Sequence, residues 1–170
     1  PISGTFVTGP TVPGKWGSAT MGTSGGVVTW SIMGPGISFP GEPGAPGLSV
    51  DLSTIFPVGY LAEIQAAFDQ WEAIADIDFV FVADGGGAFN AEPVGMIRVG
   101  AHAFDGPGGT LAHGFFPPVN GTFAAGDIHF DAAETWKLSF GGPGFDIQQV
   151  MAHEIGHAIG RDVVFRIAEF

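Results

Sequence analysis

The hydrophobic positions of the first half of this chain predict one strand, one long loop and one helix. Apolar and β-branched residues over 27–32 predict a strand, and the glycine- and proline-rich stretch 34–47 predicts an exposed loop. Between residues 60 and 74, apolar side chains recur at spacings of three and four, which is typical of an amphipathic helix. These positions are Leu61, Ile64, Phe68, Trp71 and Ile74.

The second half predicts several strands and a second helix. The short apolar runs 77–82 and 96–99 indicate buried strands, and residues 110–116 and 127–130 indicate two more. A helix is expected to begin near Asp146, a capping acid, and to end at Gly160. This order favours a mixed α/β layer with the second helix beneath the sheet.

Composition narrows the classes of partner and site. The 170 residues suit a single domain, 1–170, and the 29 glycines and 13 prolines predict many loops. A net charge of −12 with only 5 Lys and Arg argues against nucleic acid or an anionic membrane as partner and favours divalent cations, although it also fits a merely soluble protein. Without cysteines, a metal must use histidine and carboxylate ligands. No apolar run reaches membrane-spanning length.

The segment 153–157 reads His-Glu-Ile-Gly-His and lies within the second predicted helix. Residues four apart share a helix face, so His153 and His157 can bind one zinc ion while Glu154 polarises a water. Such a pentapeptide also arises by chance on helix surfaces. Gly160 extends it to the longer pattern in which a glycine turns the chain toward a third ligand.

Two upstream stretches carry a family resemblance. Residues 104–117 read FDGPGGTLAHGFFP and residues 126–136 read GDIHFDAAETW. Together with the zinc-type helix they resemble the matrixins, the matrix metalloproteinase family of metzincin zinc peptidases, over residues 16–160. The resemblance implies an α/β (α+β) zincin-like fold with a twisted, mixed five-stranded sheet and two long helices. It also implies a secreted or extracellular metalloendopeptidase, a hydrolase with Glu154 as general base acting on protein or peptide substrates.

The resemblance implies a substrate-binding edge strand at residues 110–116. The peptide would lie antiparallel to Thr110, Leu111, Ala112, His113 and Gly114, held by backbone hydrogen bonds. Backbone groups near Ala112 would assist the developing oxyanion.

Two further metal sites are implied by the family. His113 and His129 match ligands of a structural zinc, and His102 is a substitute for a histidine missing from a shortened loop that also lacks the family's aspartate. The alternative is that these are hydrogen-bonded strand histidines.

A calcium site maps onto the same region, with capped turns and surface acids as its alternative. Its ligands would be the carboxylates of Asp105, Asp131 and Glu134 and the carbonyls of Gly106, Gly108 and Thr110. Asp127 is a candidate for a second calcium.

The chain departs from the family after Gly160. The third zinc ligand would fall at Val163, which cannot bind metal, and Asp162 is the nearest substitute. Residues 161–170 match nothing in the family, whose Met-turn and final helix are absent, so we expect a truncated member with an atypical tail. The apolar tail is expected to pack against the sheet or another chain. A catalytically silent calcium- and zinc-binding domain is therefore the main alternative, and a calcium-stabilised adhesion module a third.

Overall fold

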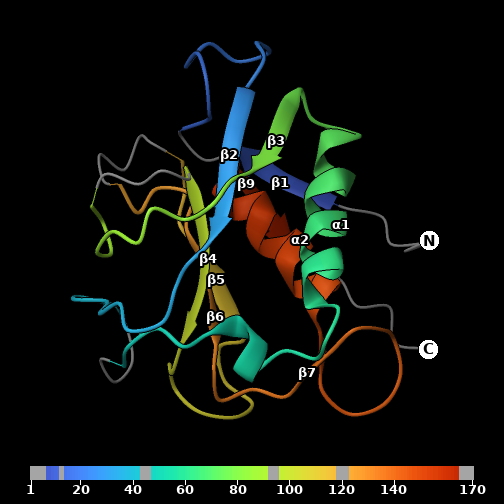
Figure 1. Cartoon of the computed structure of the whole chain (residues 1–170). Coiled ribbons are helices and arrows are strands. Elements are labelled where there is room, and N and C mark those ends of the chain that lie inside the picture. The colour runs from blue at the N-terminus through green and yellow to red at the C-terminus, as the bar shows by residue number, and fades with distance from the viewer. Residues whose placement is uncertain (1–6, 12–13, 43–46, 92–95, 118–122, 165–170) are drawn as a thin grey trace.

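A computed structural model describes residues 7–11, 14–42, 47–91, 96–117 and 123–164. Its elements follow the predicted order and add several short ones (Figure 1). In chain order they are β1 (Val7–Thr11), β2 (Gly26–Ile32), the 3-10 helix η1 (Leu52–Thr54), α1 (Tyr60–Glu72), β3 (Ile77–Phe81), β4 (Ile97–His102), β5 (Ala112–Gly114), β6 (Ile128–Asp131), β7 (Trp136–Lys137), β8 (Phe145–Asp146), α2 (Ile147–Ala158) and β9 (Arg161–Val164).

The centre of the molecule is a mixed five-stranded sheet of order β3-β2-β4-β6-β5, in which β5 alone runs antiparallel to its neighbour. Figure 1 shows α1 and α2 together on one side of this sheet. The α/β (α+β) fold with five strands and two helices is therefore confirmed. Among the described residues, neither helix has the length and hydrophobicity needed to cross a bilayer.

The face of the sheet that meets the helices forms the main core. Ile97, Val99 and Ala101 of β4 and Phe130 of β6 pack there against α1 and α2. Asp146 caps the start of α2 by accepting a 2.8 Å hydrogen bond from the Gln149 amide, as the sequence predicts. Gly160 has a φ of +84°, the left-handed conformation at which glycine ends a helix without strain.

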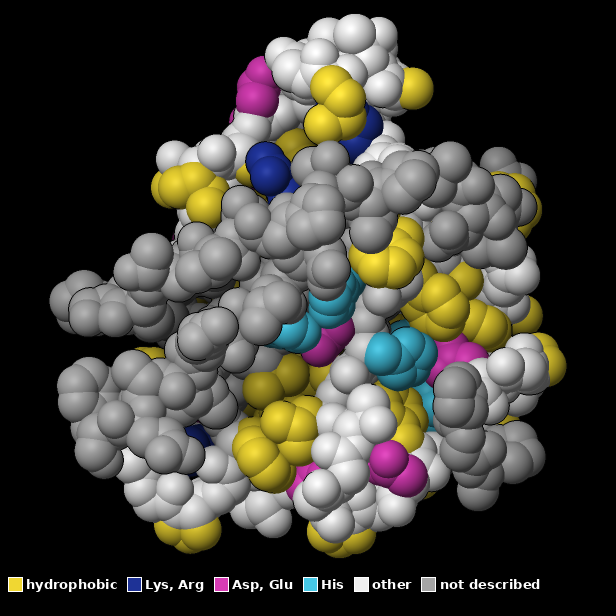
Figure 2. All heavy atoms as spheres, turned by 180° about the vertical axis from the view of Figure 1, so that it is seen from behind, with side chains coloured by type: hydrophobic (Ala, Val, Ile, Leu, Met, Phe, Trp, Pro, Cys, Tyr) yellow, Lys and Arg dark blue, Asp and Glu magenta, His cyan; other side chains and the backbone are white. Residues whose placement is uncertain are grey.

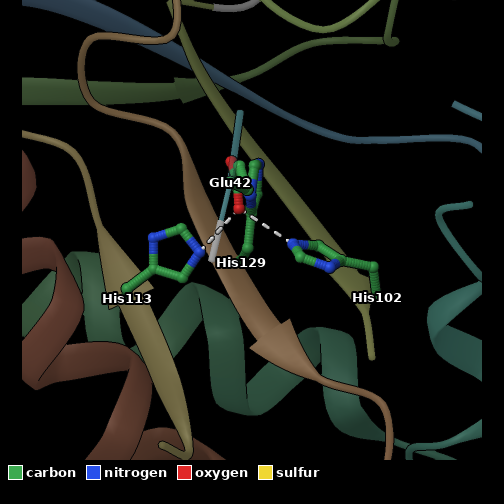
Figure 3. Close-up of side chains that lie close together, drawn as sticks. All are labelled: Glu42, His102, His113 and His129. Carbon is green, nitrogen blue, oxygen red and sulfur yellow. Dashed lines mark hydrogen bonds and ion pairs between the residues drawn. The ribbon is translucent and has the colours of Figure 1, made fainter. Parts of the chain in front are cut away.

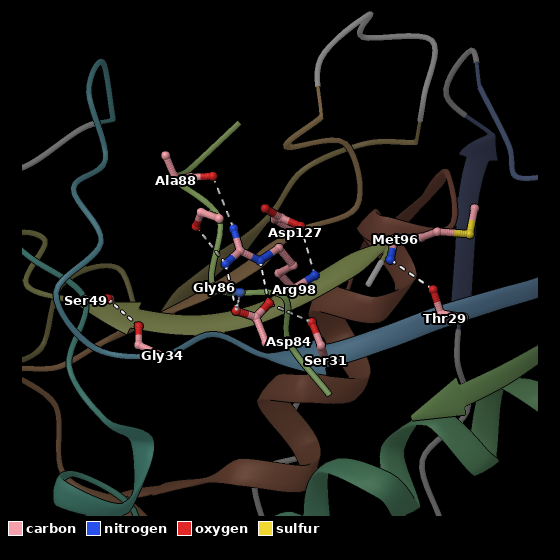
Figure 4. A network of polar contacts seen from close by, with 11 residues as sticks. Thr29, Ser31, Gly34, Ser49, Asp84, Gly86, Ala88, Met96, Arg98 and Asp127 are labelled. Carbon is pink, nitrogen blue, oxygen red and sulfur yellow. Dashed lines mark hydrogen bonds and ion pairs between the residues drawn. The ribbon is translucent and has the colours of Figure 1, made fainter. Parts of the chain in front are cut away.

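At β4 and β6 the opposite face of the sheet is buried as well, and there it carries polar side chains. Because side chains alternate along a strand, Arg98 and His102 of β4 and His129 of β6 all lie on this face. Asp84 forms two hydrogen bonds with the Arg98 guanidinium, at 2.7 Å and 2.9 Å (Figure 4). Burial would raise the pKa of Asp84, but Arg98 lowers it below its ordinary value, so this pair is ionised. Hydrogen bonds between side chains of the protein itself therefore hold Arg98 in place on this polar face.

Three local expectations from the sequence were wrong. The segment expected to be an exposed loop, residues 34–47, contains the buried Phe39, and residues 43–46 lie outside the described part. Leu61 and Ile74 belong to the predicted apolar stripe but are exposed. The buried face of α1 is formed by Ile64, Ala67, Phe68 and Trp71, and Ile74 lies beyond the end of the helix. The run 77–82 forms an edge strand, so Phe81 is half exposed instead of buried.

The chain beyond Gly160 leaves the helix as a strand. β9 pairs antiparallel with β1, with Val7 opposite Val164 and Thr11 opposite Arg161. The sequence patterns did not predict either strand. The pairing explains why α2 does not continue through Arg161, and residues 165–170 lie outside the described part.

Candidate functional site

The two histidines of the HExxH segment converge on one point. His153 and His157 both lie on α2, and their Nε2 atoms are 3.1 Å apart. The rings are nearly perpendicular, at 88°, and both side chains are partly exposed. Two nitrogens bound to one tetrahedral zinc would be roughly 3.3 Å apart. The pair therefore has the geometry of two ligands for one metal ion.

Glu154 lies beside this pair but is buried, with 5% of its surface exposed. Burial raises the pKa of Glu154 to about 8, although a hydrogen bond from the Gly114 backbone N–H opposes the rise. Its Oε2 atom is buried and has no hydrogen-bond partner in the described protein. A cation at the neighbouring imidazoles would favour the carboxylate form and leave one oxygen able to accept a proton.

The edge strand β5 approaches α2 closely at this point. A Cβ atom added at Gly114 would lie 2.7 Å from the Glu154 carbonyl oxygen, so only glycine fits here without a shift. β5 forms the end of the sheet, and its outer edge is unpaired by any described strand. Beside it lies a pocket of about 320 Å³, lined by Leu111, Ala112, Phe145, Asp146, Gln149, Val150, His153 and Glu154. The helix histidines, the carboxylate and the strand edge thus form one site.

A second cluster lies on the opposite side of β5. His102, His113 and His129 come from β4, β5 and β6, and they surround the carboxylate of Glu42 (Figure 3). Glu42 Oε2 is 2.9 Å from His102 Nε2 and 2.9 Å from His113 Nε2, and Oε1 is 2.9 Å from His129 Nδ1. These four ligand atoms lie within 4.8 Å of one another. In the part of the chain that the structure describes, no other acidic and histidine residues form such a compact group of three or more.

The contacts of the His102 ring are compatible with a cation in this cluster. Its Nδ1 is 3.0 Å from the Ala103 carbonyl, which can only accept, so the proton of a neutral ring is assigned to Nδ1. Nε2 then presents a lone pair to Glu42, itself an acceptor, 2.9 Å away. Two lone pairs at that distance repel unless His102 is charged or a metal ion lies between them. A backbone acceptor on the far ring nitrogen is also typical of metal-binding histidines.

The other members of the cluster fit the same interpretation. Burial would raise the pKa of Glu42, but the three imidazoles lower it well below its ordinary value. Burial lowers the pKa of His129 to about 4, although Glu42 opposes this, so its ring is neutral at physiological pH. The 2.9 Å contact between His129 Nδ1 and Glu42 Oε1 lacks hydrogen-bond geometry. A carboxylate and neutral imidazoles form a suitable ligand set for zinc.

Aromatic rings enclose the cluster. Phe39 stacks on His102 with ring centroids 4.3 Å apart and meets the edge of His129. Phe104 lies against His102 and His113, and Phe115 lies against His113 and His129. Such an apolar surround limits water access and strengthens charge interactions within it.

The acidic residues predicted to bind calcium all accept hydrogen bonds from backbone N–H groups of neighbouring turns. Asp105 accepts from the Thr110 amide at 3.1 Å, and Glu134 accepts from the Gly108 amide at 2.6 Å. Asp131 accepts from the amides of Phe104 and Ala133. The structure therefore places Asp105, Asp131 and Glu134 around one glycine-rich loop but does not gather them into a compact ligand group. Gly106 and Gly108 adopt positive φ within that loop.

Two other candidates stand apart from these groups. Asp127 is buried and accepts a 2.8 Å hydrogen bond from the Arg98 amide, and burial raises its pKa to about 8 (Figure 4). Asp162 lies in β9, and its side chain is outside the described part of the chain.

The principal residue that sequence reasoning missed is Glu42. It precedes His102 by 60 positions and sits in a glycine- and proline-rich segment, so no local spacing connects it to the histidines. The space-filling view in Figure 2 shows histidine side chains next to acidic ones on one face of the molecule, among hydrophobic groups.

Comparison with known proteins finds matches within one family. The family model for matrixin (Peptidase_M10) matches residues 57–162. Human matrix metalloproteinase-20 is 36% identical over 132 residues, which is 72% of this chain and 26% of that protein. Stromelysin-3 of Rattus norvegicus is 56% identical over 57 residues, which is 34% of this chain and 11% of that protein. Human matrix metalloproteinase-17 is 41% identical over 95 residues, which is 55% of this chain and 15% of that protein.

The match to the family model covers the helix α1, the polar strands β4 to β6 and the helix α2. The chain spans about a quarter or less of the length of the three relatives. Since the family model covers more than half of the chain, the chain belongs to the matrixin family.

Proposed function

We propose that this chain is a zinc-dependent endopeptidase. The observation that carries the proposal is the convergence of His153 and His157, with Nε2 atoms 3.1 Å apart, next to Glu154 and to the edge of β5 that no described strand covers. Membership of the matrixin family supports the same class of activity. The alternative of a calcium-stabilised adhesion module leaves this arrangement without a role.

Each residue of the site would have a separate role in peptide hydrolysis. A peptide would pair antiparallel with β5, along Thr110, Leu111, Ala112, His113 and Gly114, and place one side chain in the 320 Å³ pocket. Zinc held by His153 and His157 would supply Lewis acidity to a carbonyl and acidity to a bound water. Glu154 would take a proton from the attacking water at its unpartnered oxygen and pass it to the leaving amine. The Gly114 N–H would keep this carboxylate in place.

A third zinc ligand would be needed for a complete catalytic site. Asp162 is the candidate within the tail, since Gly160 turns the chain away from the helix axis before it. The alternative is a catalytically silent metal-binding domain, which we call the silent-domain alternative. In that case the tail does not bring the Asp162 carboxylate to the two histidines.

The first experiment measures zinc after exhaustive dialysis of the full chain and hydrolysis of a peptide library. We expect His157→Ala to lose one equivalent of zinc and all detectable hydrolysis, because a single remaining imidazole cannot hold the ion. The control is Glu63→Gln on α1, outside both histidine groups, which should keep both the zinc and the hydrolysis. If the unmodified chain retains no zinc that His157→Ala removes, and cleaves no peptide, the silent-domain alternative is correct.

We also propose a second zinc ion at Glu42, His102, His113 and His129. The four residues provide a full tetrahedral set, so this site would be structural and not catalytic. It would connect three strands of the sheet to the segment around Phe39.

Calcium would bind at the loop 105–110. Oxygen ligands would come from Asp105, Asp131 and Glu134 and from the carbonyls of Gly106, Gly108 and Thr110. The carboxylates already satisfy backbone N–H groups there, so calcium must share them.

We expect 1 mM calcium to raise the melting temperature of zinc-loaded protein, because it binds only the folded loop. A hundredfold excess over Kd corresponds to about 2.7 kcal/mol and a shift of roughly 5–10 °C. The shift should disappear in Glu134→Gln and persist in Glu63→Gln, a substitution of the same type on α1. An equal shift in both variants would assign calcium elsewhere.

A further inference from the structure

Two buried tryptophans donate hydrogen bonds to the main chain of the zinc-type helix. Trp71 Nε1 donates to the carbonyl of Ala152 at 2.7 Å, and Trp16 Nε1 donates to the carbonyl of Ala158 at 2.8 Å. Only 3% of Trp71 and 4% of Trp16 is exposed. Ala152 immediately precedes His153 and Ala158 immediately follows His157, so the two hydrogen bonds bracket the histidine pair.

The two donors come from different parts of the fold. Trp71 lies in the last turn of α1, and Trp16 lies in the segment before β2. Ala152 and Ala158 are about 9 Å apart along the helix axis, from a rise of about 1.5 Å per residue. Directional bonds at two separated points oppose both sliding and rotation of α2. Rotation matters because a register change of one residue turns each imidazole by about 100°.

Each indole is itself held firmly. A Cβ atom added at Gly126 would lie 2.6 Å from Cζ2 of Trp16, so the ring packs directly on this backbone. Ala158 is the final residue of α2, where carbonyl groups lack the partner available within a helix. The Trp71 ring is held in a different way, because it belongs to the main core, in which α1 packs along α2. Both rings are therefore anchored in parts of the structure outside α2.

We infer that Trp16 and Trp71 are positioning residues that fix the register of α2 and thereby hold His153 and His157 convergent. The inference rests on the proposed function for its consequence, since the convergent pair is the proposed zinc site. Both tryptophans act through the backbone of α2 and touch neither metal nor substrate.

The test replaces each indole with a ring that cannot donate. Trp16→Phe and Trp71→Phe remove the N–H group, and site-specific benzothienylalanine removes it while keeping the bicyclic shape. Trp136→Phe is the matched control, because Trp136 is 5% exposed and its Nε1 donates at 3.1 Å to the Asp131 carbonyl, which is not on α2. For each full-length variant, zinc affinity at the helix pair is measured by chelator competition, alongside melting temperature.

We expect each α2-directed variant to lower zinc affinity at the helix pair by about 10-fold or more, as disruption of outer-shell partners commonly does. Trp136→Phe should lose comparable thermal stability with zinc affinity within about twofold of the unmodified chain. Affinity losses that are equal in all three variants, or absent in Trp16→Phe and Trp71→Phe, would overturn the inference.

A second measurement separates this inference from the proposed function. Imidazole ¹⁵N resonances of His153 and His157 are recorded in metal-free protein, where no zinc binding is required. We expect them to move in the Trp16 and Trp71 variants and to stay in place in the Trp136 variant. If the unmodified chain binds no zinc at the helix pair, the proposed function is wrong. The inference is judged separately by the resonances in metal-free protein. It is supported if they move in the Trp16 and Trp71 variants and overturned if they do not.

Discussion

Replacing Glu154 with glutamine is expected to remove nearly all peptide hydrolysis while zinc remains at His153 and His157. Glutamine keeps the size of the side chain and can still accept the Gly114 N–H. It cannot take a proton from water, and a positioned general base contributes about 10²- to 10⁴-fold to the rate. The measurement is kcat/KM on a cleaved peptide, together with zinc content by mass spectrometry.

Two controls define this result. Glu154→Asp retains a carboxylate that is one methylene shorter, so its activity should be intermediate. Zinc content should equal that of the unmodified chain in both variants, which separates the role of a base from that of a ligand. Hydrolysis by Glu154→Gln within about tenfold of the unmodified rate would assign the base to another residue.

The parts of the fold that the sequence predicted well are those with a local signal. α2 follows from its capping Asp146, its apolar positions and the glycine after it, and these residues interact with one another along the helix. β2 and β4 follow from short apolar runs. The convergence of His153 and His157 needs only helical spacing, so it could be predicted before any tertiary contact was known.

The parts that failed depend on contacts between distant segments. Leu61 and Ile74 have the right period for the core, but Leu61 is off the buried face of α1 and Ile74 lies beyond the end of this helix, so both are exposed. Phe81 is half exposed because β3 forms the edge of the sheet, and strand order is not visible in an apolar run. The pairing of β1 with β9 joins opposite ends of the described chain.

In the histidine cluster, some residues could be predicted from local sequence signals and one could not. Strand alternation and register place His113 opposite His129 on one face, which the strand predictions allow. The fourth member, Glu42, lies outside the helices and strands, and its carboxylate completes a compact group of four possible metal ligands. A residue that is distant in sequence can therefore join such a group without any local signal in the sequence.

Replacing Glu42 is expected to change both the zinc content and the thermal stability of the protein. Glu42→Gln should lose one equivalent of zinc while the helix pair keeps its own, because the substitution removes the only anionic ligand among four. Loss of a metal present at a hundredfold excess over Kd corresponds to about 2.7 kcal/mol, or roughly 5–10 °C in melting temperature. Zinc stoichiometry and thermal unfolding are measured on the same samples.

Chelation distinguishes a metal ligand from a hydrogen-bond partner. If Glu42 binds zinc, the difference in melting temperature between Glu42→Gln and the unmodified chain should shrink sharply once a strong chelator has removed the metal. If Glu42 only accepts hydrogen bonds from the three imidazoles, the difference should be the same with and without metal. Glu63→Gln makes the same change of charge on α1 and should have little effect in either condition. An unchanged zinc stoichiometry in Glu42→Gln would show that the three histidines hold the ion without this carboxylate.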